Sequence, residues 1–231
     1  MAIPIYLAMT PAEYSACGEI PPSVAWMSCH FSLSGPGLSN IPGTMPSGAV
    51  LILDDQIPFC GHQSKIIAQQ LQNAANLLQP KAIILDFQRP GNDDVRKLAE
   101  MLSASLSCPV IASAMYAHSE MPVLLPPCPP NRPLYEHIAP HRQQEIWLEL
   151  SQDRLVLEIT KDGCCSRDTP CSEEVFPFSD EKLHCHYRIE KKENAVIFYL
   201  QRSRDDLHNL LRQAETLGVT HAIGLWQELK S

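Results

Sequence analysis

Runs of consecutive apolar residues alternate with helix-like segments along the first half of the chain. Continuous apolar runs predict strands that are buried on both faces, as in a parallel sheet covered by helices. Five such runs occupy residues 3–9, 23–31, 48–55, 81–87 and 108–116. Their alternation with helical segments predicts an α/β fold.

Three segments between these runs carry helix signals. Residues 64–80 place apolar side chains at spacings of three and four and end in a proline, and residues 92–106 have a similar periodicity. Thr10, Pro11 and Glu13 form a capping box with proline at the first helical position. This motif predicts a short helix after the first strand.

The second half begins with a sixth short apolar run, in residues 121–133, and then changes character. Residues 145–160 and 182–201 alternate around polar turns and predict antiparallel hairpins. A helix over residues 203–218, with Gly218 at its carboxyl end, and a strand over residues 220–226 then restore the earlier order.

These elements predict that the whole chain, residues 1–231, forms one irregular (β/α)8 TIM-type barrel domain. The eight barrel strands are expected to end near residues 9, 30, 54, 87, 116, 125, 200 and 226, and several connections between them are too short for a full helix. A small antiparallel β insertion is predicted at about residues 145–190, with Trp147 anchoring its hairpin on the barrel. An open doubly wound α/β sheet is the alternative.

The composition narrows the classes of partner. With a net charge of −8 and an isoelectric point near 5.5, the chain is a poor partner for nucleic acid or an anionic membrane surface. It has neither the roughly 18 consecutive apolar residues of a membrane-spanning helix nor a basic start followed by an apolar run, so we expect a cytoplasmic location. The nine cysteines lack the spacing of a disulfide framework, which predicts reduced and mostly buried thiols.

Two of the predicted strands carry motifs of a known family. The sequence LDFQRPG, residues 85–91, resembles the signature strand of glycoside hydrolase family 18, the chitinases and endo-β-N-acetylglucosaminidases. That strand has the pattern D-x-x-D-x-D-x-E and commonly continues with an aromatic residue and Pro-Gly. The sequence AIGLWQEL, residues 222–229, is similar to the family's closing strand, whose tryptophan forms the floor of the subsite where the sugar is cleaved. The resemblance implies a barrel, a saccharide ligand and a place for Trp226 at that floor.

The signature strand departs from the family pattern at the positions that carry the chemistry. In the family, the terminal glutamate protonates the leaving oxygen, and the aspartate two residues earlier helps the substrate's acetamido group act as nucleophile. The matching residues here are Gln88 and Asp86, and the two earlier acidic positions hold Ile84 and Lys81. A carboxamide has no proton to donate at a usable pKa, and loss of a general acid lowers the rate by roughly 10²–10⁴. Substrate-assisted hydrolysis is therefore not expected, although Asp86 and Gln88 can still hydrogen bond a sugar.

Asp54 and Asp55 are a second source of acidic groups, because they end the third predicted strand at the face where barrel active sites form. Neighbouring strand residues face opposite ways, so one of the two is expected to point inward. That residue could pair with Asp86 as a two-carboxylate hydrolase site. The alternative role for either carboxylate is to bind backbone amides in the following loop.

Aromatic and metal-binding side chains complete the candidates. Tyr116 and Tyr199 end the fifth and the expected seventh strand, where their rings could stack on a sugar beside Trp226 or pack in the barrel mouth.

His184 and His186 follow three cysteines with zinc-ligand chemistry, but the set lacks a C-x-x-C pair. The three thiols belong to Cys164, Cys165 and Cys171. Residues 32–40 are glycine-rich without the lysine and spacing of a phosphate loop. We therefore expect neither a metal nor a cofactor.

The leading hypothesis is a barrel similar to family 18 that has lost hydrolase activity and binds a saccharide or another small polar ligand. Its ligand-binding residues would be Asp86, Gln88, Trp226, Tyr116 and Tyr199. Two alternatives stay open: an active hydrolase that uses Asp54 or Asp55 with Asp86, and a non-catalytic protein-interaction module.

Overall fold

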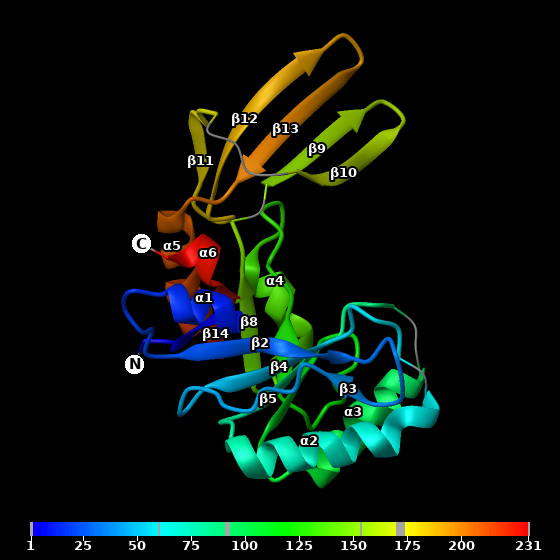
Figure 1. Cartoon of the computed structure of the whole chain (residues 1–231). Helices are drawn as coiled ribbons and strands as arrows, with labels where there is room; N and C mark the ends of the chain where they lie inside the picture. Colours follow the sequence, from blue (N-terminus) through cyan, green and yellow to red (C-terminus); the bar gives the residue numbers. More distant parts are fainter. Residues whose placement is uncertain (1, 60, 91–92, 153, 170–173, 231) are drawn as a thin grey trace.

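Eight parallel strands close into a barrel (Figure 1). The computed structural model describes residues 2–59, 61–90, 93–152, 154–169 and 174–230. The barrel strands, in spatial order, are β1 (Ile5–Met9), β14 (Val219–Leu225), β8 (Ile146–Leu150), β7 (Val123–Leu125), β6 (Val110–Ser113), β5 (Ile83–Asp86), β4 (Val50–Asp54) and β2 (Val24–Phe31). β1 also pairs with β2, which closes the sheet, and β3 (Leu38–Ser39) runs antiparallel to β2. The predicted irregular TIM-type barrel is thus confirmed, and the open doubly wound sheet is wrong.

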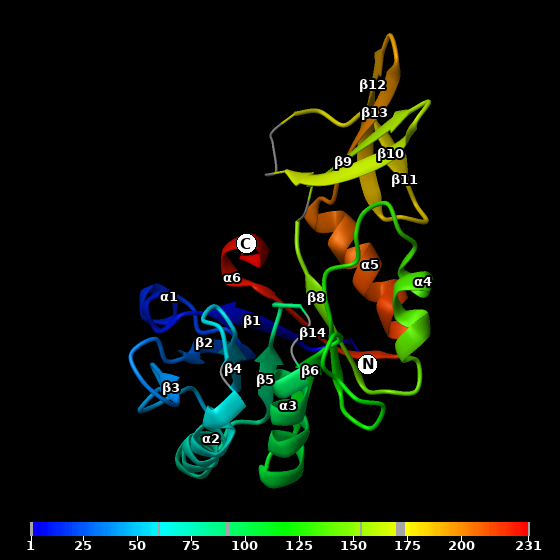
Figure 2. The ribbon, with the colours of Figure 1, turned by 90° about the vertical axis from the view of Figure 1, so that its right-hand side faces the viewer.

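The connections between the barrel strands are unequal. Two full helices, α2 (Ser64–Leu78) and α3 (Asp93–Ser105), follow β4 and β5 and lie side by side outside the barrel (Figure 2). In contrast, residues 114–122 join β6 to β7 without a helix. The remaining helices are α1 (Pro11–Ala16), η1 (Gly61–Gln63), α4 (Leu134–Ile138), η2 (Ala139–His141), α5 (Arg204–Thr216) and α6 (Trp226–Leu229). None of the helices in the described part of the chain has the length and apolarity needed to cross a bilayer.

The predicted helix ends are present. Thr10 Oγ1 accepts the Glu13 amide and the Glu13 carboxylate accepts the Thr10 amide, which is the reciprocal capping box expected for α1. Such a cap stabilises a helix by about 1 kcal/mol. At the end of α5, Gly218 adopts a positive φ of 92°, a conformation that glycine tolerates best.

Alternate residues of the barrel strands fill the interior, and the others pack beneath the helices. The interior cluster consists of Tyr6, Ala8, Ala25, Val50, Ile52, Ala82, Ile84, Ile111, Leu124, Trp147 and Ile223. At its amino-terminal end, the Trp147 ring stacks on His221 at 4.1 Å and lies 5.2 Å from Tyr6, measured between ring centroids. The interior is therefore a packed core, and in barrels of this type ligands bind at the carboxyl ends of the strands.

The seventh barrel strand differs from the prediction. It is β8, which was expected to form the first strand of an inserted hairpin, whereas β13 (Ala195–Gln201) was expected in the barrel. Trp147 consequently lies inside the barrel and does not anchor the insertion. Both segments are apolar enough to be buried, so local sequence does not decide between them. β8 pairs with β7 and β14, whereas β9 pairs with β10 and β13, so β8 and β9 are not the two strands of one hairpin.

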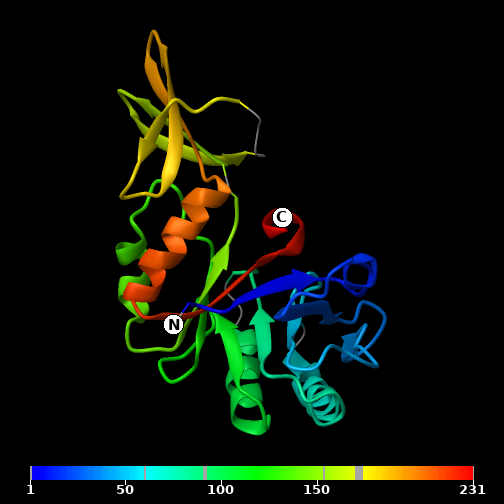
Figure 3. The same ribbon diagram turned by 90° about the vertical axis from the view of Figure 1, so that its left-hand side faces the viewer.

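The insertion is a five-stranded antiparallel sheet that projects from the barrel beside the start of α5 (Figures 1 and 3). Its spatial order is β10 (Gly163–Thr169), β9 (Arg154–Thr160), β13, β12 (Cys185–Lys192) and β11 (Phe178–Asp180). The strands span residues 154–201, a later range than the predicted 145–190. Arg202 is buried where the insertion returns to the barrel, and it donates hydrogen bonds to the carbonyls of Cys128, Pro129, Leu183 and His184. These bonds tie the sheet to the loop before α4.

Candidate functional site

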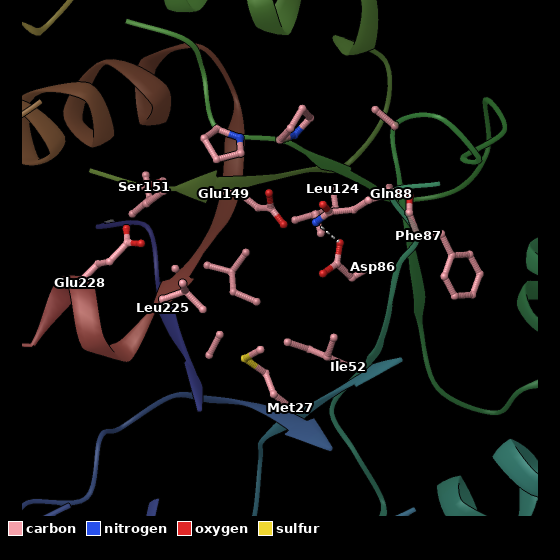
Figure 4. Close-up of a pocket in the computed structure, with 18 of the residues that line it drawn as sticks. Met27, Ile52, Asp86, Phe87, Gln88, Leu124, Glu149, Ser151, Leu225 and Glu228 are labelled. Carbon is pink, nitrogen blue, oxygen red and sulfur yellow. Dashed lines mark hydrogen bonds between the residues drawn. The ribbon is translucent and has the colours of Figure 1, made fainter. Parts of the chain in front are cut away.

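A cavity of about 770 Å³ lies at the carboxyl ends of β5, β6, β7, β8 and β14 (Figure 4). Its polar lining residues are Asp86, Gln88, Ser113, Glu149, Ser151 and Glu228. The remaining lining residues are mostly apolar and include Met27, Ile52, Leu124, Ile223 and Leu225. A volume of roughly 300–1,000 Å³ and a largely apolar lining with a few polar groups are typical of small-molecule sites.

Asp86 and Gln88 meet at one side of this cavity. They lie two residues apart at the end of β5, so their side chains share a face, and Gln88 Nε2 donates to Asp86 Oδ1 at 3.0 Å. Burial raises the pKa of Asp86, the Gln88 hydrogen bond opposes this shift, and the charges of Asp54 and Asp55 add to it. Asp86 is therefore a carboxyl group whose charged form is disfavoured by its surroundings.

The backbone after β5 is fixed from two sides. On one side, the Asp55 carboxylate accepts the amides of Gln88 at 3.0 Å and Arg89 at 2.8 Å. On the other, Ser113 Oγ donates to the Phe87 carbonyl at 2.6 Å and the Tyr116 hydroxyl donates to the Arg89 carbonyl. These bonds hold the loop in place and therefore set the direction of the Asp86 and Gln88 side chains.

Asp54 and Asp55 do not line the cavity that contains Asp86. Asp55 is 6% exposed and acts on backbone amides, the alternative role considered above for these carboxylates. Asp54 Oδ2 lies 2.7 Å from His30 Nδ1, and its Oδ1 accepts the Gln56 amide at 3.1 Å. The structure thus gives both acids partners of their own outside the Asp86 cavity.

The aromatic candidates also lie elsewhere. Trp226 begins α6 and packs against the outer core cluster, and Leu225 lines the cavity in its place. Tyr116 is 1% exposed, and its hydroxyl serves the Arg89 carbonyl. Tyr199 belongs to the inserted sheet, where its hydroxyl donates to Glu190, so its expected place at the end of a barrel strand is wrong. Among the residues described, no tyrosine or tryptophan lines this cavity.

Two acids of the site were missed by sequence reasoning. Glu149 follows Trp147 by two residues on β8 and so faces the barrel interior, and in Figure 4 its side chain points into the cavity with Asp86 and Gln88. Glu228, on α6, lines the rim and accepts the Gln152 amide at 3.1 Å. The alternation in the sequence IWLEL would have revealed Glu149 had β8 been assigned to the barrel.

The described histidine and cysteine candidates do not form a group of three or more metal-binding side chains. His184 hydrogen bonds Gln213, and His186 Nδ1 lies 2.7 Å from Asp206 Oδ2. Cys164 and Cys165 are exposed on β10, and Cys171 lies outside the described residues. Elsewhere, burial raises the pKa of Cys29 and of Cys185 to about 12, which keeps both thiols protonated and unreactive.

The barrel is similar to solved structures of glycoside hydrolase family 18 and of a chitinase-like protein. One is the chitinase-like agglutinin RobpsCRA from Robinia pseudoacacia, with a TM-score of 0.61, 9% identity, and 96% of this chain and 94% of that chain covered. A family 18 N-acetylglucosaminidase from Paenibacillus barengoltzii matches with a TM-score of 0.59 and 5% identity over the same shares. A family 18 chitinase mutant from Cycas revoluta, in complex with (GlcNAc)4, matches with a TM-score of 0.57 and 9% identity, again over 96% and 94%.

At these identities the likeness establishes the fold. The chain has the barrel fold of the family 18 proteins, as the motifs at residues 85–91 and 222–229 predicted. No protein-family profile matches the sequence, and no curated protein sequence matches it significantly. The function must therefore be argued from the cavity itself.

Proposed function

We propose that this barrel binds a saccharide in the cavity beside Asp86 and does not hydrolyse it. The proposal depends on one observation, the hydrogen bond from Gln88 Nε2 to Asp86 Oδ1. At the strand position where the resemblance implies a proton-donating glutamate, the chain has an amide that only hydrogen bonds. This end of β5 therefore suits recognition better than general acid catalysis.

The shape and chemistry of the cavity support a neutral sugar as ligand. Hydrogen-bonding side chains of Asp86, Gln88 and Glu149 face an apolar surface that includes Met27 and Leu225. Sugars present hydroxyl groups around their edge and C–H groups on their faces, so both kinds of surface can be satisfied at once. An anionic ligand would approach Asp86, Glu149 and Glu228 together and would be repelled.

The structural neighbours suggest which sugar to try first. One of them is a chitinase-like agglutinin, and another was crystallised with (GlcNAc)4. N-acetylglucosamine oligomers are therefore the natural first probes of the Asp86 cavity.

Calorimetric titration of the protein with (GlcNAc)4 tests this proposal. We expect saturable binding that Asp86→Ala weakens by about tenfold or more, because hydrogen bonds to a charged group contribute roughly 1.5–3 kcal/mol. Asp162→Ala, at the exposed turn between β9 and β10, is the matched control and should bind as the native protein does. Absence of binding, or equal binding by Asp86→Ala, would contradict a sugar site here.

One observation favours a second candidate, an active hydrolase. Asp86 and Glu149 line the same cavity, and burial gives Asp86 the raised pKa that a proton donor needs. In this candidate, Asp86 protonates the leaving oxygen while Glu149 takes a proton from the water that attacks the anomeric carbon. This pair replaces the pairing of Asp86 with Asp54 or Asp55. Release of sugar fragments that is lost in Glu149→Gln would establish it. The protein-interaction module named above stays a prediction.

A further inference from the structure

A second cavity, of about 710 Å³, lies beside the first and is built from other elements. Its walls come from the carboxyl ends of β2 and β4, the start of α1, and residues 40–44 after β3. Met27 lines both cavities, so the two are neighbours. The saccharide proposal uses none of the polar side chains of this second cavity, which include Trp26, Ser28 and His30.

The backbone of β2 is irregular where it lines this cavity. Met27 pairs with Ile52 and Cys29 pairs with Leu53, so Ser28 is an extra residue in the strand, as in a β-bulge. A bulge changes which face the following side chains take, and bulges are frequent next to functional sites. Here Cys29 and Phe31 pack into the outer core, while His30 lies beside Asp54 on β4.

Asp54 orients the His30 ring. The distance between His30 Nδ1 and Asp54 Oδ2 is 2.7 Å, and a carboxylate can only accept, so Nδ1 carries the proton. In the neutral ring, Nε2 is then a hydrogen-bond acceptor on the opposite side of the imidazole. His30 lines the cavity, and this nitrogen is available to a ligand that offers an N–H or O–H group.

Trp26 and Ser28, which both line this cavity, each have a buried donor without a partner in the described part of the chain. Trp26 Nε1 and Ser28 Oγ have no hydrogen-bond partner among the residues described, although Trp26 is only 6% and Ser28 9% exposed. Buried polar groups in native proteins are almost always paired, so each exception calls for a partner that the chain itself does not supply. A ligand oxygen that reaches these atoms would satisfy them.

The charges around the cavity select a neutral ligand. Asp54 is one of its lining residues, and its charge helps to raise the pKa of Asp86 in the neighbouring cavity. Among the described residues, no lysine or arginine lines the second cavity. A carboxylate or phosphate would meet this negative charge without a compensating cation.

We propose that the second cavity is a separate binding site for a neutral secondary amide, whose carbonyl oxygen accepts from Trp26 and Ser28 and whose N–H donates to His30. Such an amide occurs both in acylated amino sugars and in peptides. This site does not depend on the saccharide proposal, because it uses different residues and walls.

The indole N–H signal of Trp26 in ¹H–¹⁵N spectra reports on this site directly, and Trp26→Phe assigns it by its loss. The probes are N-acetylalanine methylamide and N-acetylglucosamine, with N-acetylalanine as the charged counterpart. We expect a saturable downfield shift with at least one neutral amide and a much weaker response to the carboxylate. A response to one neutral probe alone supports the site and identifies the source of the amide.

Matched variants separate this site from its neighbour. Ser28→Ala and His30→Ala should each weaken the Trp26 response by roughly 5- to 10-fold, the effect of one lost hydrogen bond. Asp86→Ala, which should impair the first cavity, should leave the response unchanged, while the Trp147 and Trp226 signals report that the fold is intact. No shift with either neutral amide would mean that water satisfies the two donors, and it would overturn the proposal. A shift that persists in His30→Ala and Ser28→Ala would overturn it as well.

Discussion

The ends of β4 and β5 lie side by side and carry acids in register, yet their carboxylates have different tasks. Asp54 pairs across the sheet with Asp86, and Asp55 follows Asp54 directly. The β4 acids are engaged by the protein, since Asp54 binds His30 and Asp55 binds two backbone amides. At the end of β5, Asp86 lines a cavity, and its hydrogen-bond partner within the described residues is the Gln88 side chain.

This difference shows what makes an acid at a strand end structural. Asp55 follows the last residue of β4, and its carboxylate accepts the Gln88 and Arg89 amides in the loop after β5. Asp86, the last residue of β5, lines the cavity and hydrogen bonds the Gln88 side chain. The type and position of a residue in the sequence do not separate these cases, but the local backbone does.

The largest effect is expected from Asp55→Ala. This change leaves the Gln88 and Arg89 amides without their acceptor and should lower the free energy of unfolding by about 2–4 kcal/mol. Urea denaturation followed by circular dichroism measures the change. Glu100→Ala, an exposed acid on α3, is the control and should stay within about 0.5 kcal/mol of the native protein. An equally small effect of Asp55→Ala would show that its two hydrogen bonds contribute little.

A smaller, pH-dependent loss is expected from Gln88→Glu. The new carboxylate would lie beside Asp86, where Gln88 Nε2 now donates at 3.0 Å. Two like charges 4 Å apart repel by about 1 kcal/mol in bulk water. Stability should match the native protein in acid, where both groups are protonated, and should fall as the pH rises and both ionise. Thermal unfolding across the acid range measures this, and a constant difference at all pH values would argue against repulsion.

Gln88→Glu also tests whether the cavity lacks nothing but a proton donor for hydrolysis. If only the missing proton donor prevents hydrolysis, Gln88→Glu should release fragments from N-acetylglucosamine oligomers.

The smallest effect is expected from Asp86→Asn, and its sign follows from the raised pKa of Asp86. The folded state binds the Asp86 proton more tightly than the unfolded chain does, so this stabilisation is complete below the unfolded value of 3.8. It is lost as the pH rises through the raised folded value. Asp86→Asn should therefore be more stable than the native protein at pH 7 and should lose that advantage in acid. The difference in unfolding free energy between the two proteins, measured against pH, is the test, and an opposite slope would contradict it.

Much of the fold could be predicted because local patterns agree with it. The capping box at Thr10, the periodicity of α2 and the glycine after α5 each specify an element without tertiary information. The seventh strand could not be assigned, since β8 and β13 are both short apolar strands. β8 belongs to the barrel because it pairs with β7 and β14, and such pairing between distant segments cannot be read from the local sequence.

The site residues that lie on one strand could be predicted from the sequence, whereas those that depend on how several strands pair could not. Asp86 and Gln88 follow from alternation along β5, and they do line the cavity. Glu149 was hidden by the misplaced seventh strand. The last strand was predicted to include Trp226, but β14 ends one residue earlier, at Leu225. Trp226 is the first residue of α6, and its side chain packs against the outer core.

The central claim is that the cavity beside Asp86 holds a sugar without cleaving it. The most direct measurement incubates the native protein with (GlcNAc)4 under conditions in which calorimetry shows binding, and then determines the oligomer length by mass spectrometry. We expect the bound tetramer to be recovered intact. Accumulation of shorter oligomers, abolished by Glu149→Gln and by Asp86→Asn, would contradict the account and identify Asp86 and Glu149 as the groups of an active hydrolase.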